Sequence, residues 1–325
     1  MSRRVVVVSR RVVLAALALA AWIAGSTLGI SAPGGTPKAA ARPFLEIGQA
    51  HAGFAPTLDG SKPIFILFIG SGARPGEDVE HSLADSIHIV SINPAKHRSA
   101  ILGIPRDSWV DIPGHGSSKI NSSMVYGGPQ LLVQTIESLT GIHLDYWVLT
   151  TFWGFTKMVN TIGGLTVDVP FAMHDSYSGS DFEPGVQVLK GPDALAFARD
   201  RHSLPEGDFG RSEDGGRLIV AALQQFRKEY SKDPSRLLIW VAAGLRNVQT
   251  DVPFDQVLKL AFTALSVNPK YVENVVAPGT TGMVGGSSVV NLTSDAQTIF
   301  HDMAGDGLIA KKNLPPSPNA SLLGG

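Results

Sequence analysis

Four arginines lie close together in a stretch rich in glycine and acidic residues, Phe197–Arg217. They are Arg199, Arg201, Arg211 and Arg217. A guanidinium stays charged at physiological pH, and its planar fork binds a phosphate through two parallel hydrogen bonds. The cluster therefore suggests a phosphate or pyrophosphate ligand. The other reading is neutralisation of these arginines by acids of the same stretch, which are Asp200, Glu206 and Asp208.

A second cationic segment lies upstream, where Arg106 and Asp107 are followed by Lys119. Asp107 either holds Arg106 in place or accepts a proton, and the spacing leaves both open. The chain has 325 residues, a net charge of −1 and no cysteine. This charge gives no bulk attraction to nucleic acid, so no nucleic-acid partner is predicted. The missing cysteine excludes disulfides, thiolate metal sites and cysteine nucleophiles.

The N-terminus predicts a membrane anchor. Four arginines between residues 3 and 11 precede the uncharged apolar run Val12–Ile30, which is just long enough to span the hydrocarbon of a bilayer. Flanking basic residues keep their end in the cytoplasm. We therefore expect a cytoplasmic tail at 1–11, a single-pass anchor at 12–30 and the rest of the chain on the extracytoplasmic side of the cell membrane. The alternative is a cleaved signal peptide.

Composition divides the remainder of the chain. The Gly-, Pro- and Ala-rich residues 31–60 predict a linker, residues 61–312 the globular domain, and residues 313–325 a disordered tail. Apolar runs predict strands at Ile64–Ile69, Ser86–Asn93, Ser99–Ile104, Tyr146–Thr150, Leu165–Val169 and Tyr271–Val276. Helical spacing is found at Pro129–Leu139, Phe152–Ile162, Gly191–Ala198, Leu218–Tyr230, Pro234–Arg246, Phe254–Val267 and from Ser294. The alternation predicts a three-layer α/β domain with a mixed central sheet flanked by helices.

Two smaller features are open or weak. The apolar stripes of the later helices form either ordinary core or a groove for a lipid tail, with candidates Leu237, Leu238, Trp240, Val241, Leu258 and Phe262. Thr281–Gly286 lacks the lysine of a nucleotide-binding loop and is expected to be a plain loop. The histidines show no close helical pairing, so zinc is not expected.

Several segments in series resemble the LytR–CpsA–Psr family of cell-wall glycopolymer phosphotransferases. They are ADSI before the strand VSINP, then IPRD, KIN, YGG, GGLTVDVP, ARDRH and DFGR, over about Ile64–Leu223. The resemblance implies a mixed sheet with a pocket for a polyprenyl-pyrophosphate lipid. It also implies transfer of a lipid-linked glycopolymer to a peptidoglycan hydroxyl, with positive charge on the pyrophosphate and magnesium bound by hard oxygen ligands.

The resemblance also implies roles for particular residues. Arg106, Arg199 and Arg201 would clamp the phosphates, with Asp107 beside them, and Asp85 would ligate Mg²⁺. Arg74, Lys119 and Arg211 would add to substrate binding.

Three expected polar groups are missing. Gly72 stands where the family has a magnesium-binding aspartate, Leu83 where it has an arginine, and Gly215 where a glutamine is common. Each loss should weaken metal or phosphate binding. Asp78, Glu80, His81 or Arg74 could compensate, or could simply be solvated.

The leading hypothesis is thus a membrane-anchored transferase with a partly degenerate site. The alternatives are a degenerate paralogue that binds the lipid-linked precursor without turnover, and a lipid pyrophosphatase.

Overall fold

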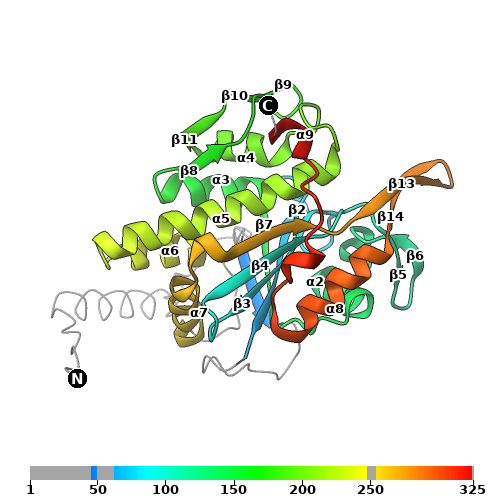
Figure 1. Ribbon diagram of the computed structural model, residues 1–325, viewed down its shortest axis with the longest axis horizontal. Coiled ribbons are helices and arrows are strands. Elements are labelled where there is room, and N and C mark those ends of the chain that lie inside the picture. Colours follow the sequence, from blue (N-terminus) through cyan, green and yellow to red (C-terminus); the bar gives the residue numbers. More distant parts are fainter. Residues whose placement is uncertain (1–44, 50–61, 247–253, 324–325) are drawn as a thin grey trace, which may run out of the picture.

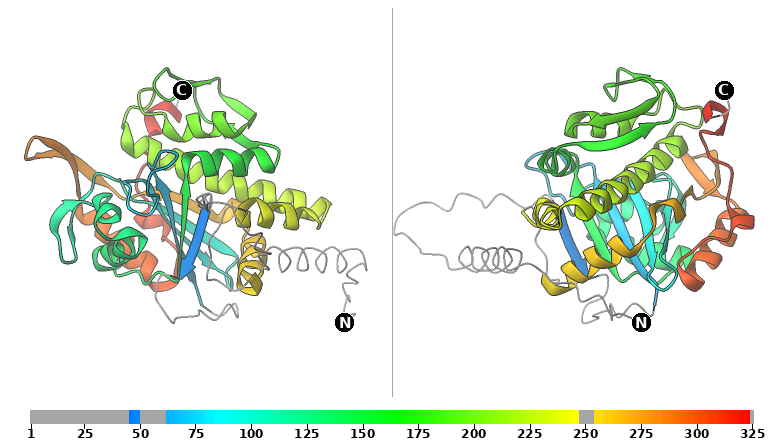
Figure 2. Two further views of the ribbon diagram at one scale, coloured as in Figure 1. Left: turned by 180° about the vertical axis from the view of Figure 1, so that it is seen from behind. Right: turned by 60° about the vertical axis from the view of Figure 1, so that its left-hand side comes forward.

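A six-stranded mixed sheet forms the centre of the molecule (Figures 1 and 2). The computed structural model describes residues 45–49, 62–246 and 254–323. The strand order is β1 (Leu45–Gln49), β7 (Tyr146–Thr151), β2 (Ile64–Ser71), β3 (Ala84–Asn93), β4 (Arg98–Gly103) and β12 (Val272–Val276). Strand β3 is antiparallel to both β2 and β4, whereas β2–β7 and β4–β12 are parallel pairs. The mixed sheet expected from the sequence is confirmed.

Alternation along β2 gives the sheet two apolar faces, because successive side chains of a strand point to opposite sides. Phe65, Leu67 and Ile69 belong to the larger core, which lies under α2 (Ser122–Thr140) and α8 (Ser294–Asp306). Ile64 and Ile66 belong to a smaller core on the other face, against α7 (Phe254–Ser266). Helices therefore cover both faces, as predicted (Figure 2).

A second structural layer lies beyond the long helix α5 (Asp208–Lys232), which crosses the sheet (Figure 1). It contains α3 (Phe152–Thr161), α4 (Gly191–Arg199), the strand pair β8 (Leu165–Val169) with β11 (Gly185–Leu189), and the pair β9 (Met173–Asp175) with β10 (Ser180–Phe182). Their apolar side chains pack on α5 in a separate core. Helix α6 (Arg236–Leu245) continues this layer beside α7.

Helix α5 begins ten residues before the predicted start at Leu218, so the glycine-rich DFGR segment is helical. The glycines allow close packing. A Cβ at Gly216 would lie 1.9 Å from Asn274 Oδ1, and one at Gly215 would lie 2.9 Å from His88 Cε1. Helix α2 likewise starts before Pro129, and Gly128 (φ 66°) forms the kink at which Pro129 begins a new turn.

Two hairpins lie at one end of the sheet: β5 (Trp109–Ile112) with β6 (Gly116–Lys119), and β13 (Gly279–Val284) with β14 (Ser287–Leu292). The prediction of a plain loop at 281–286 is therefore wrong. It forms the end of β13 and the turn, where Gly285 and Gly286 adopt positive φ values.

The ends of the chain differ in part from the prediction. The anchor at 12–30 lies outside the described residues, and none of the described helices is long and apolar enough to cross a membrane. The linker range contains β1, which pairs with β7. The expected disordered tail instead packs on α5, because Asn319 is fully buried there and donates hydrogen bonds to Glu213 and to the carbonyl of Gly210. It includes the short helix α9 (Ala320–Leu323).

Candidate functional site

A cavity of about 560 Å³ lies between helices α3, α5, α6 and α7 and the face of the sheet that carries Ile66. Its walls are almost wholly apolar and include Phe68, Val148, Leu223, Trp240, Val257 and Leu260. Among the six side chains proposed for a lipid groove, Trp240 lines the cavity, whereas Leu237 and Val241 pack into the core between α5, α6 and α7. These helices therefore contribute side chains both to the core and to the cavity, so each of the two interpretations left open by the sequence applies to some of the six residues.

Five charged side chains of the described residues also line the cavity. They are Asp85, Arg106, Arg199, Asp208 and Arg211. Asp85 lies at the start of β3 and Arg106 just beyond β4. The antiparallel pairing of these strands brings the two side chains together, as shown by the register His88↔Gly103. The first turn of α5 adds Asp208 and Arg211 from a distant part of the chain.

Two guanidinium groups share the carboxylate of Asp208 in this cluster, and both also contact Asp85. Arg106 forms an ion pair with Asp85, and its Nε lies 3.6 Å from Asp208 Oδ1. Arg211 pairs with the same Asp208 oxygen at 2.8 Å and donates to the Asp85 carbonyl at 2.9 Å. Among the described residues, Arg106 Nε and Asp208 Oδ2 are buried without a hydrogen-bond partner. The cluster therefore has unused donor and acceptor capacity next to the cavity.

The electrostatics of the two arginines differ. Burial alone would lower the pKa of Arg106, but the nearby carboxylates, led by Asp208 and then Asp85, outweigh burial and raise it. Burial lowers the pKa of Arg211, and the positive charge of Arg106 lowers it further. Two crowded guanidinium groups repel each other, so an added anion would be favourable here.

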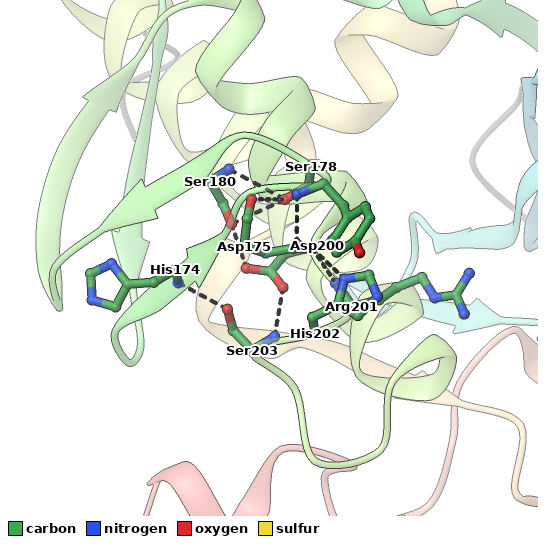
Figure 3. Close-up of polar contacts among 9 residues, drawn as sticks. His174, Asp175, Ser178, Ser180, Asp200, Arg201, His202 and Ser203 are labelled. Carbon is green, nitrogen blue, oxygen red and sulfur yellow. Dashed lines mark hydrogen bonds and ion pairs between the residues drawn. The ribbon is translucent and has the colours of Figure 1, made fainter.

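Arg199 and Arg201 separate in space although they are two residues apart. Arg199 lines the cavity, with its guanidinium 5.2 Å from the centre of the Phe152 ring. Arg201 is exposed, is not among the residues that line the cavity in the described part of the chain, and extends away from its neighbours in Figure 3.

Three other predicted site residues lie outside the charged cluster. Lys119 forms an ion pair of 3.0 Å with Asp107, and Arg74 is exposed after β2. The structure thus links Arg106 and Arg211 to Asp85 and places Arg199 on the wall of the same cavity. Arg201, Asp107, Lys119 and Arg74 are not among the lining residues in the described part of the chain. The roles of all eight stay predictions.

Two buried carboxylates hold the loop after Arg199 (Figure 3). Asp175 is 3% exposed and accepts from the amides of Tyr177 and Arg201 and from His202 Nδ1. Asp200 is fully buried and accepts from the Ser180 hydroxyl and the Ser203 amide. Burial opposes the ionisation of Asp175, yet these hydrogen bonds, led by the one from His202, hold its pKa well below its ordinary value. The pair therefore fixes the backbone of residues 200–203, which carries Arg201 and directly follows Arg199.

His88 is a site residue that the sequence reasoning did not find. Its ring is 3% exposed, lines the cavity, donates from Nε2 to the Ser212 carbonyl at 2.8 Å and lies 3.0 Å from Ser86 Oγ through Nδ1. It occupies the space that a side chain at Gly215 would need. The sequence offered one signal for this histidine. Gly215 stands where the family commonly has a glutamine, and a glycine on α5 leaves space for a side chain from the sheet.

The comparisons with known proteins decide the family. The model of the LytR_cpsA_psr family matches residues 45–303. The chain belongs to the LytR–CpsA–Psr family. Its matched range includes the sheet, the cavity and the charged cluster.

The chain is similar to curated proteins in sequence and to solved structures in fold. The polyisoprenyl-teichoic acid–peptidoglycan teichoic acid transferase TagU of Halalkalibacterium halodurans is 33% identical over 205 residues, which are 62% of this chain and 66% of that protein, just under two thirds of its length. Bacillus subtilis TagV is 27% identical with a TM-score of 0.65, covering 75% of this chain and 96% of that one. TagT solved with bound octaprenyl pyrophosphate lipid has a TM-score of 0.58 at 21% identity, over 82% of this chain and 95% of that chain, and shows the fold alone.

The magnesium ion that the family resemblance implies does not fit the residues present. A Cβ added at Gly72 would lie 2.4 Å from Asp85 Oδ2, so position 72 is next to Asp85 but supplies no ligand. The Asp85 carboxylate is already paired with Arg106. Asp78 pairs with His81 at the exposed surface. Among the described residues, no three His, Cys, Asp or Glu side chains are grouped to hold a metal ion.

Proposed function

We propose that this LytR–CpsA–Psr protein transfers a glycopolymer from a polyprenyl-pyrophosphate carrier to peptidoglycan at the outer face of the cell membrane. The observation that carries the proposal is one apolar cavity that ends in a cluster of guanidinium groups. A prenyl chain is wholly apolar and a pyrophosphate wholly anionic, so such a lipid matches both parts of the site. The names of TagU and of lipid-bound TagT support this ligand class.

The residues suggest how transfer would proceed. The acceptor hydroxyl forms a bond to the phosphorus that carries the glycopolymer, and the bond from that phosphorus to the lipid phosphate oxygen breaks. Prenyl monophosphate leaves with the electron pair, and the hydroxyl proton passes to water or to a carboxylate at the cavity. Asp107, the acceptor that the sequence suggested, would first have to leave its ion pair with Lys119 outside the cluster. Arg106, Arg199 and Arg211 stabilise the charge on the phosphates, which is the main demand of phosphoryl transfer. Arg201 would join them only if its exposed side chain turned toward the cavity, because it is not among the lining residues in the described part of the chain.

Substitutions at the two ends of the site test the proposal. Arg106→Gln should lower the transfer rate by about 10²-fold, as loss of one charged donor does in other enzymes. Ala261→Trp, in the cavity wall, should weaken binding of undecaprenyl pyrophosphate but not of a short-chain prenyl pyrophosphate. The matched control is Lys96→Gln, because Lys96 pairs with Asp306 at the surface away from the cavity.

The assay follows a fluorescent polyprenyl-pyrophosphate glycan with peptidoglycan fragments and separates the products. Glycan phosphate joined to peptidoglycan supports transfer. Free glycan phosphate alone identifies a lipid pyrophosphatase. Tight binding without either product identifies a precursor-binding paralogue, which the missing groups at Gly72 and Leu83 would explain. Absence of binding by the unmodified protein would reject the proposal.

A further inference from the structure

We infer that this chain binds its pyrophosphate ligand without a divalent cation, the arginine cluster replacing the metal. The inference rests on the proposed function and adds to it the charge balance of the site. It distinguishes this chain from a protein in which two carboxylates hold Mg²⁺ against the phosphates. Four observations support it, and each concerns the place where such an ion would lie.

The first observation is the state of Asp85. Its Oδ1 pairs with Arg106 Nη1, and the two side chains are about one fifth exposed, at 19% and 23%. To ligate a cation, this carboxylate would have to give up a charge-assisted hydrogen bond in a partly desolvated site. Asp85 therefore already has the positive partner that a metal would supply.

The second observation concerns position 72. Residue 72 is a glycine and supplies no second carboxylate beside Asp85. A Cβ at this position would meet Asp85 Oδ2 at 2.4 Å, so Asp85 occupies the space that a side chain at position 72 would need. The Gly72 amide donates to the Leu83 carbonyl at 2.9 Å, which fixes the two chain segments beside each other. Magnesium requires a nearly ideal octahedron of hard oxygen ligands, usually with one or two free carboxylates. Here position 72 offers none, and the carboxylate of Asp85 already pairs with Arg106 through Oδ1.

The third observation concerns Asp208, the other carboxylate of the cluster. Its Oδ1 accepts from Arg211 Nε at 3.1 Å and pairs with Arg211 Nη2 at 2.8 Å. The same oxygen lies 3.6 Å from Arg106 Nε. All of these contacts use Oδ1, whereas Oδ2 is buried without a hydrogen-bond partner among the described residues. A cation at Oδ2 would therefore lie beside two guanidinium groups, whose positive charge disfavours it.

The fourth observation is the balance of charge. The described residues that line the cavity include three guanidinium groups, from Arg106, Arg199 and Arg211, and two carboxylates, from Asp85 and Asp208, which leaves one positive charge in excess. Arg211 is only 12% exposed, so water screens its charge weakly. A pyrophosphate that enters this site therefore meets an excess of positive charge in a partly desolvated environment, without a metal ion.

Binding measurements with and without magnesium test the inference. The full-length chain in detergent is titrated with undecaprenyl pyrophosphate, following the fluorescence of Trp240 in the cavity wall. One series contains millimolar MgCl₂ and the other EDTA, with ionic strength matched by NaCl because salt alone weakens charge interactions. The expected dissociation constants agree within about twofold, since two ligands without coupling do not change each other's affinity.

A designed carboxylate gives the matched positive control. Gly72→Asp should weaken binding in EDTA, because two adjacent carboxylates repel each other and the phosphates, and magnesium should restore it by about tenfold or more. Gly72→Asn has the same size without the charge and should stay insensitive to magnesium. Calorimetry with MgCl₂ alone should show a new cation site in Gly72→Asp only.

The outcomes separate the inference from the function. Binding by the unmodified chain only in magnesium would overturn the inference and leave the proposed function standing. Binding in neither buffer would reject the lipid-pyrophosphate function, and the inference with it. A Gly72→Asp protein that ignores magnesium would show that position 72 is not beside a metal position, and would remove the second observation.

Discussion

His88 links the sheet to α5 through a buried, neutral ring. Burial, and then the nearby charge of Arg211, lower its pKa from about 6.5 to about 4, although its hydrogen bond to the Ser212 carbonyl opposes this shift. In the unfolded chain the ring gains a proton near pH 6.5. The folded state therefore binds fewer protons than the unfolded state between these two values.

A pH dependence of stability follows. The contribution of neutral His88 is fully present above pH 6.5 and is lost as pH falls toward 4, by up to about 3 kcal/mol. Urea unfolding at pH 7 and pH 4.5 should show this loss, and His88→Gln should reduce it because glutamine does not titrate. An equal pH dependence in both proteins would contradict the assignment. Of this residue network, the sequence could predict the arginines but not their partners, because Asp85, His88 and Arg211 meet only through strand register and the packing of α5.

The segment that joins α4 to α5 is held by two buried carboxylates, of which Asp175 contacts Arg201 and His202. Asp175→Asn would replace an acceptor of three hydrogen bonds with a group that also carries donors, which the amide of Arg201 and the ring of His202 cannot satisfy. We expect about tenfold weaker lipid binding, a loss of about 1.5 kcal/mol, from the less ordered position of the arginines.

Hydrogen exchange of the 200–203 amides should speed up in Asp175→Asn. The control is Asp181→Asn, since Asp181 lies on the neighbouring strand β10, pairs with His174 and has a 90% exposed side chain. Unchanged exchange in Asp175→Asn would show that the loop keeps its shape without the carboxylate.

At the level of elements, the sequence predicted the apolar strands well, because continuous runs such as Ile64–Ile69 have few other uses. It missed the start of α5, since Gly210, Gly215 and Gly216 are poor helix formers in isolation. Tertiary packing overrides that preference here: the missing Cβ atoms are what allow Asn319, His88 and Asn274 to approach the helix.

Across the whole molecule, the last residues of the described chain are joined to the candidate site. Asn319 and Ser317 donate to Glu213 Oε2 at 3.0 and 2.7 Å, two residues beyond Arg211. Composition could not predict this contact, because a short polar tail has no hydrophobic periodicity. The side-chain amide of Asn319 is buried only because groups of α5 are placed to accept its hydrogen bonds.

Loss of the hydrogen bonds between Asn319 and α5 should also affect the candidate site. Asn319→Ala should lower the free energy of unfolding by about 1–2 kcal/mol, the cost of leaving buried groups without a partner. It should also weaken lipid binding, because α5 carries Arg211. Denaturant titration and the fluorescence assay measure the two effects, with exposed Ser321→Ala as the control. Equal stability of both variants would show that the tail is only lightly held.

The cavity between the sheet and its helices also has a consequence for the protein without its lipid. Protein interiors normally pack as densely as organic crystals, and the lining of a void loses dispersion contacts. A prenyl chain in this space would restore those contacts and thus act as a removable part of the hydrophobic core. By mass action, the stability of the folded protein would then rise with the concentration of free carrier lipid in the membrane. A cell short of carrier would hold this protein in its less tightly packed form.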